Sequence, residues 1–67
     1  MTTEEIDTIT ALLTEMTKPS PASRWSVVRE FEVDEGMALV IYVDELDANM
    51  IVLRTEYEEG KASYALV

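Results

Sequence analysis

The apolar residues of this 67-residue chain change their spacing once, and that change most limits the fold. Before Pro19 they recur every three or four residues, as in one stripe of an amphipathic helix: Ile6, Ile9, Leu12, Leu13 and Met16. After Ser23 they recur at every second residue, which is typical of strands with one face toward water. An α+β protein with one N-terminal helix and a sheet is therefore predicted.

The helix is predicted over residues 3–17. Thr2 and Glu5 fit a capping box, in which each side chain accepts a hydrogen bond from the other residue's backbone N–H group. The early acids Glu4 and Glu5 suit the positive end of the helix dipole, and Pro19 ends the helix. Residues 18–23, rich in Pro and Ser, are expected to form a linker.

Four strands are predicted near residues 24–33, 37–44, 49–57 and 61–67. Gly36 and Gly60 lie in the first and third turns, where a hairpin needs a positive φ. The short connections favour antiparallel neighbours. Residues 1–67 are thus expected to be a single αββββ domain, with the helix packed on a four-stranded antiparallel meander.

Strand register is predicted by placing apolar residues opposite one another, because a one-residue slip reverses every side chain. This criterion predicts a three-residue loop over residues 34–36 and a two-residue loop over residues 59–60. The expected pairs are Val33–Met37, Phe31–Leu39, Val27–Val43, Ile41–Ile51, Leu53–Leu66, Tyr57–Ala62 and Glu58–Lys61. Arg29 opposite Ile41 is the one mismatch in this register.

Acidic residues outnumber basic ones by 14 to 5, which gives a net charge of −9, and the chain has no His or Cys. This charge argues against nucleic acid or a membrane as a direct ligand, because both require clustered Lys and Arg. Disorder is not expected either, since 48% of the residues are hydrophobic. Without cysteine, a signal peptide or a membrane-spanning run, the protein is expected to be cytoplasmic.

A meander brings its first and third turns to the same end of the sheet, and the helix is expected to begin there too. Ten of the 14 acids then gather in an acidic pole, made of Glu4, Glu5, Asp7, Glu30, Glu32, Asp34, Glu35, Glu56, Glu58 and Glu59. The seven hairpin residues among them, Glu30 to Glu59, are the candidate contacts to a partner protein with a basic surface. The alternative is that these acids reflect only solvated turns and the helix dipole.

The sheet face away from the helix is predicted to carry apolar residues. It should remain uncovered, because one short helix covers only one face. We expect a homodimer through this self-association face, with Val28, Val40, Tyr42, Met50 and Val52 as its members. The alternative is that the sheet curls and the linker folds across it.

No enzyme activity is predicted, because the chain lacks His, Cys and a Gly-rich phosphate loop, and its serines have no identifiable base. No cofactor or metal site is predicted. Residues 44–49 offer oxygen ligands but lack the spacing and the glycine of an EF-hand loop.

Two functions remain open. The first is a small acidic inhibitor or adaptor that occupies a basic, nucleic-acid-binding surface of a partner, with carboxylates acting as a nucleic-acid mimic. In size and charge the chain is similar to small phage anti-CRISPR and anti-restriction proteins, and inhibition by electrostatic competition is what that likeness implies. The second is a homo-oligomeric structural or assembly module that uses the apolar sheet face.

Overall fold

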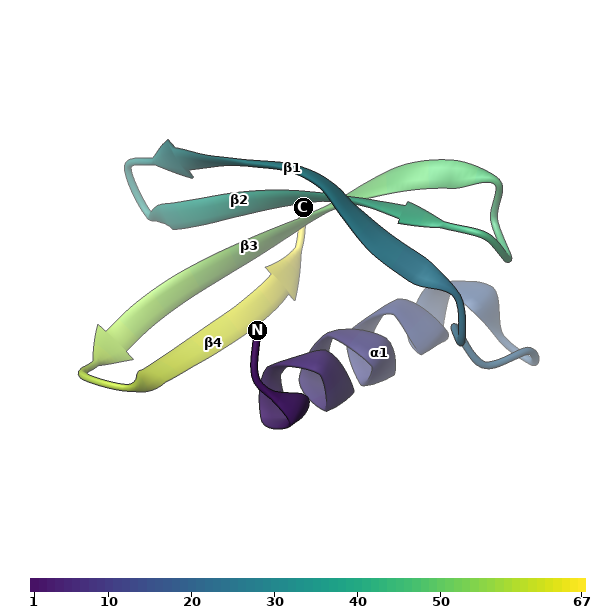
Figure 1. The fold of residues 1–67 in the computed structure, drawn as a ribbon, viewed down its shortest axis with the longest axis horizontal. Coiled ribbons are helices and arrows are strands. Elements are labelled where there is room, and N and C mark those ends of the chain that lie inside the picture. Colours follow the sequence, from purple (N-terminus) through teal and green to yellow (C-terminus); the bar gives the residue numbers. More distant parts are fainter.

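The computed structural model describes all 67 residues, as one helix and one four-stranded sheet (Figure 1). Helix α1 (Thr3–Thr17) precedes strands β1 (Trp25–Val33), β2 (Gly36–Val43), β3 (Ala48–Glu58) and β4 (Lys61–Leu66). The strands follow one another in the order β1-β2-β3-β4, and all neighbours are antiparallel. The predicted αββββ meander is confirmed.

The capping signal and the linker together fix both ends of α1. The Glu5 N–H group donates to Thr2 Oγ1 at 3.2 Å, and the Thr2 N–H group donates to Glu5 Oε1 at 3.4 Å. At the other end, the Thr17 hydroxyl donates to the Ser20 carbonyl at 2.6 Å, and the Ala22 N–H group donates to Thr14 Oγ1 at 3.1 Å. The linker therefore folds back along the last turns of the helix.

The core lies between α1 and one face of the sheet. Its largest fully buried side chains are Ile9, Leu13, Ile41, Val43 and Val52. A hydrogen bond joins the start of β1 to the helix: the Trp25 indole Nε1–H donates to Thr10 Oγ1 at 2.9 Å. Helix α1 is too short and too polar to cross a membrane, and the fold has no other helix.

The register of the first hairpin differs from the prediction. Val33 lies opposite Gly36, so the loop has two residues, and Glu30 rather than Phe31 lies opposite Leu39. A β-bulge at Val28 then restores the alternation, which brings Val27 opposite Ile41. The predicted Val33–Met37, Phe31–Leu39 and Val27–Val43 pairs are therefore wrong, because each single-residue step reverses the faces of the side chains beyond it.

The other two hairpins are shifted in the same way. Ile41 lies opposite Met50 instead of Ile51. Glu58 lies opposite Lys61 as predicted, but a bulge at Tyr57 sets Glu56 opposite Ala62 and Val52 opposite Leu66. The predicted Tyr57–Ala62 and Leu53–Leu66 pairs are therefore wrong as well.

Candidate functional site

The acidic residues of the two hairpins lie at one end of the sheet. The β1–β2 and β3–β4 turns share that end, α1 begins toward it, and the twist of the sheet spreads the two turns apart (Figure 1). The residues of the acidic pole therefore lie on two diverging hairpin ends and on the first turns of α1 at the same end of the molecule.

Three acids of the pole lie on the sheet face that holds the core farther along the strands. Glu30 and Glu32 lie opposite Leu39 and Met37, and Glu56 lies opposite Ala62. Glu30 and Glu32 are exposed there, because the end of the β1–β2 hairpin extends away from α1 (Figure 1). The Cα atoms of neighbouring residues on one face of a strand are about 6.6–6.8 Å apart, so Glu30 and Glu32 project from adjacent positions on this face.

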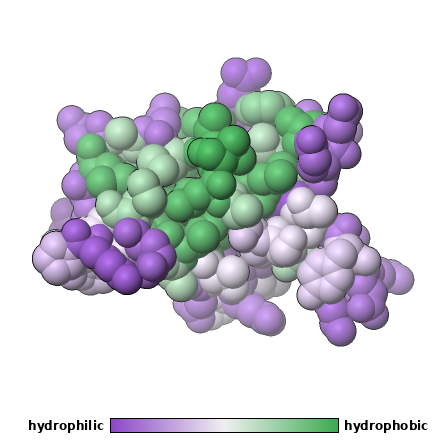
Figure 2. All heavy atoms as spheres, turned by 180° about the vertical axis from the view of Figure 1, so that it is seen from behind, coloured by the Kyte–Doolittle hydropathy of each residue, from purple (hydrophilic) through white to green (hydrophobic).

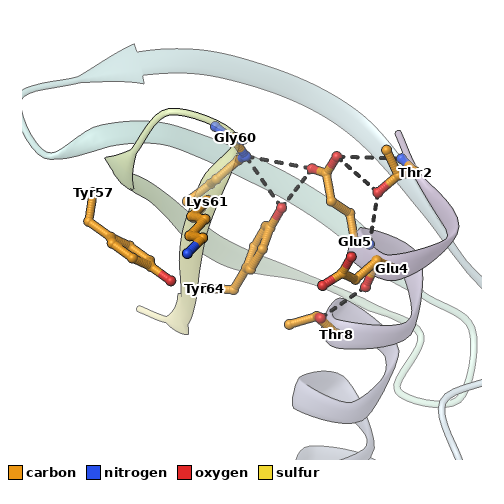
Figure 3. A pocket seen from close by; sticks show the side chains of 10 residues that line it. Thr2, Glu4, Glu5, Thr8, Tyr57, Gly60, Lys61 and Tyr64 are labelled. Carbon is orange, nitrogen blue, oxygen red and sulfur yellow. Dashed lines mark hydrogen bonds and ion pairs between the residues drawn. The ribbon is translucent and has the colours of Figure 1, made fainter.

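Arg54 is the half-buried cation on this face, and it already contacts two carboxylates. Its Nε lies 3.6 Å from Glu5 Oε2, and its Nη2 lies 3.5 Å from Glu56 Oε2. The Tyr64 hydroxyl accepts a hydrogen bond from Arg54 Nε at 3.3 Å and donates one to Glu5 Oε2 at 2.6 Å. Figure 3 shows Tyr64, Glu5 and Thr2 joined in this network, which ties α1 to β3 and β4.

Hydrogen bonds keep the Glu5 carboxylate charged. The Tyr64 hydroxyl, and after it the Thr2 backbone N–H group, hold the pKa of Glu5 below its ordinary value. Burial, together with the hydrogen bond to Glu5, raises the pKa of Tyr64. The neutral phenol and the charged carboxylate therefore reinforce each other, and this part of the pole stabilises the fold.

Two hollows flank the Arg54 side chain. The larger, about 490 Å³, lies between the first turns of α1 and the β3–β4 hairpin, and its walls include Glu4, Glu5, Tyr57 and Tyr64 (Figure 3). The smaller, about 280 Å³, is lined by Met1, Glu5, Glu30, Met37, Leu39 and Arg54. The surface around Arg54 is therefore indented, and the carboxylates that line the two hollows come from α1 and β1.

Most acids of the pole have no partner within the chain. In seven of the ten, the carboxylate accepts no hydrogen bond and forms no ion pair: Glu4, Asp7, Glu30, Glu32, Asp34, Glu35 and Glu59. At the other end of the molecule, Glu15 pairs with Lys18, Glu45 accepts hydrogen bonds from Ser23, and Asp47 accepts one from Tyr42. The unpartnered negative charge is thus concentrated at the pole.

The sheet face turned away from α1 is apolar. We call it the open face and define it by a row across the four strands, Phe31, Ala38, Leu53 and Ala65, together with the neighbouring pair Val40 and Ile51. Arg29 is the one charged residue on it apart from the Glu58–Lys61 pair at the hairpin end, and its guanidinium lies 5.3 Å from the centre of the Phe31 ring. Figure 2 shows a continuous apolar patch surrounded by hydrophilic residues.

The predicted self-association face requires correction. Val40 and Tyr42 lie on the open face, and Val28 is exposed in its bulge. Met50 and Val52 lie on the helix side instead, where Val52 is fully buried. The reason is the shifted register of β3, which also moves Ile51 and Leu53 to the open face.

The prediction from sequence missed Phe31, Ile51 and Leu53 on the open face, and it also missed the Arg54 network. One signal for the first error is the Val27–Val28 doublet, which breaks the alternation at the position of the bulge. The Arg54–Glu5–Tyr64 contacts join residues far apart in sequence and leave no comparable local pattern.

Comparison with known proteins adds no further information, because no protein-family model, no curated protein and no solved structure matches the chain. What its surfaces can bind is therefore inferred from their own residues.

Proposed function

We propose that this protein is an inhibitor or adaptor, not an enzyme, and that its acidic pole binds a basic surface of a partner protein. The surface it suits is one that otherwise binds nucleic acid, with carboxylates occupying the positions of phosphates. The observation that carries the proposal is the placement of Glu30 and Glu32. Both occupy the sheet face that elsewhere forms the core, yet both are exposed and without an ion pair.

Such an arrangement costs folding stability, because like charges at one end of a small molecule repel one another. Solubility alone needs only net charge and does not require the charge to be concentrated. Arg54 and Lys61 do not neutralise the other acids of the pole, since Arg54 contacts Glu5 and Glu56, and Lys61 pairs with Glu58 at 3.7 Å. The remaining carboxylates are free to meet cations of another protein.

Binding through the pole would be fast and sensitive to salt. Complementary charge raises association rates by roughly 10- to 1,000-fold at low ionic strength, and salt screens this gain over about 10 Å at 0.1 M. Arg is the favoured cation for such a contact, because its planar guanidinium pairs with carboxylates in a bidentate manner. The smaller hollow beside Arg54, which Glu5 and Glu30 line, is one place where such a side chain could contact the pole.

The test compares two variants that lose the same charge at opposite ends of the molecule. The pole variant changes Glu30, Glu32 and Glu35 to Gln and Asp34 to Asn, four acids that make no ion pair. The control changes the four acids outside the pole, Glu15 and Glu45 to Gln and Asp44 and Asp47 to Asn. Each immobilised chain is used to capture proteins from a bacterial lysate at low and at high salt, with and without added duplex DNA.

We expect the parent chain and the control to capture a nucleic-acid-binding protein that DNA displaces and high salt releases. The pole variant should associate with the purified partner about tenfold more slowly at low salt. Equal capture by the pole variant and the control would contradict the proposal, and so would capture that DNA does not affect.

A further inference from the structure

The open face is a second apolar surface on which no other element of the chain packs, although Ala38 within its row is only 4% exposed. Phe31 and Ile51 on this face are 39% and 40% exposed. Val40 and Leu53 are half-buried, but they belong to no part of the core cluster under α1. The linker, which was the one segment expected to cross this face, lies on the helix side, where Ala22 is fully buried against the core.

We propose that two copies of this chain associate through their open faces to form a homodimer. The inference does not depend on what the acidic pole binds. It rests on the charge of this face, on its area and on the large surface that the single chain leaves exposed.

The distribution of charge favours a second copy as the occupant. In a chain of net charge −9, the open face holds no carboxylate except Glu58, which Lys61 neutralises at the end of the hairpin. Two such faces meet without burying an unpaired acid, and Arg29, the one cation on the face apart from Lys61, lies over the ring of its own Phe31. A two-fold axis that lies in the interface and crosses the strands reverses their direction, and this places the acidic poles at opposite ends of the dimer. Two sheets packed in this way form an ordinary β-sandwich contact.

The size of the molecule also allows a dimer interface of standard area. The molecule measures 33 × 20 × 17 Å and exposes 4660 Å². A body of these proportions has roughly a fifth of its surface on each long side, or on the order of 900 Å², and a standard interface takes about 800 Å² from each partner. The exposed surface also exceeds the approximately 4,300 Å² that scaling with mass gives for a folded monomer of this size. Pairing would bury that excess.

Two isoleucines offer a matched test. Ile51 on the open face and Ile6 on α1 are 40% and 42% exposed, so changing either one to Glu adds the same charge at similar exposure. Sedimentation equilibrium of the full chain, from low micromolar to millimolar concentration, measures the dimer dissociation constant of each variant. Far-UV circular dichroism establishes that each variant is folded.

We expect the parent chain and Ile6→Glu to dimerise, and Ile51→Glu to raise the dissociation constant about 100-fold, because it brings a carboxylate into an apolar interface. Should Ile51→Glu fail to fold, Ala65→Arg places the opposite charge at an exposed position of the same face and should have the same effect. Added salt should tighten the dimer, since it screens the repulsion between two chains of like charge.

Three results would each overturn the proposal. The first is a parent chain that remains monomeric throughout this concentration range. The second is a folded open-face variant that dimerises as tightly as the parent. The third is an equal loss of affinity in Ile6→Glu, which would assign the effect to net charge instead of the open face.

Discussion

Gly36 offers the sharpest test of the strand register, on which both proposed surfaces depend. It lies opposite Val33 at the start of β2 with φ at +150°, and a Cβ atom built there would lie 2.2 Å from the backbone oxygen of Arg54. Gly60 in the third turn also has a positive φ, +78°, but a Cβ atom there meets nothing within 4 Å. Gly36→Ala and Gly60→Ala therefore make a matched pair of variants.

The expected losses of stability differ. At Gly60 the cost is that of a left-handed alanine, about 1–2 kcal/mol. At Gly36 a similar cost of about 1–3 kcal/mol for an unfavourable φ adds to the displacement of β3, which disturbs at least one hydrogen bond worth about 0.5–1.5 kcal/mol. We therefore expect Gly36→Ala to lower the free energy of unfolding by about 2–4 kcal/mol, a large share of the roughly 3–10 kcal/mol typical of a domain of this length.

Urea unfolding followed by fluorescence measures both losses. Trp25 is the single tryptophan and packs against the core, so its emission reports on the contact between α1 and the sheet. With a urea dependence of about 1 kcal/mol per M, the midpoint of Gly36→Ala should lie about 1.5 M below that of Gly60→Ala, when all chains are measured at one protein concentration.

Equal losses in the two variants would refute this reasoning. Gly36 would then lie in an open three-residue loop, where an added methyl group is free of β3. Phe31 would lie opposite Leu39, and Glu30 and Glu32 would point away from the helix side. The acidic pole and the open face would then both need to be redrawn.

Two further predictions concern α1. Thr2→Ala removes the side-chain acceptor of the capping box and should lower the free energy of unfolding by about 1 kcal/mol in the same urea assay; an unchanged midpoint would mean that the cap does not form. Tyr64→Phe removes the hydrogen bond that contributes most to the lowered pKa of Glu5. A lowered folded-state pKa contributes stability above the unfolded value of about 4.3, and this contribution is lost as the pH falls through the folded value. Tyr64→Phe should therefore be less stable at neutral pH and lose less stability on acidification, and urea midpoints from pH 7 to pH 2 that run parallel to those of the parent would contradict this.

The helix and the order of the strands were predictable because their signals are local. The stripe from Ile6 to Met16, the capping pair and Pro19 act within a few turns of the chain, and short turns leave a meander as the simplest connection. The bounds of all four strands lie within one residue of those predicted. The predicted meander also placed the first and third turns at the same end of the sheet, and the structure confirms this.

The register was not predictable by the same means, because a β-bulge is one extra residue with effects along a whole strand. Matching apolar residues across the first hairpin favoured Phe31 opposite Leu39 and left Arg29 opposite Ile41. The structure removes that mismatch with a two-residue loop, which sets Arg29 opposite Val40, and the bulge at Val28 then returns Val27 and Trp25 to the core side. The cost is that two glutamates, Glu30 and Glu32, take positions on the helix side that pairing of apolar residues alone would never assign to them.

The bulge at Val28 links the two surfaces. The two-residue loop places Phe31 on the open face and Glu30 and Glu32 on the helix side, beyond the end of α1, and the bulge lets Trp25 and Val27 still face the core. The register of β1 therefore keeps these two acids of the pole off the open face. Salt should then affect the two associations in opposite directions, weakening the attraction of the pole for a basic partner and relieving the repulsion between two open faces. Over one series of increasing salt concentrations, the dimer should therefore tighten while the basic partner dissociates.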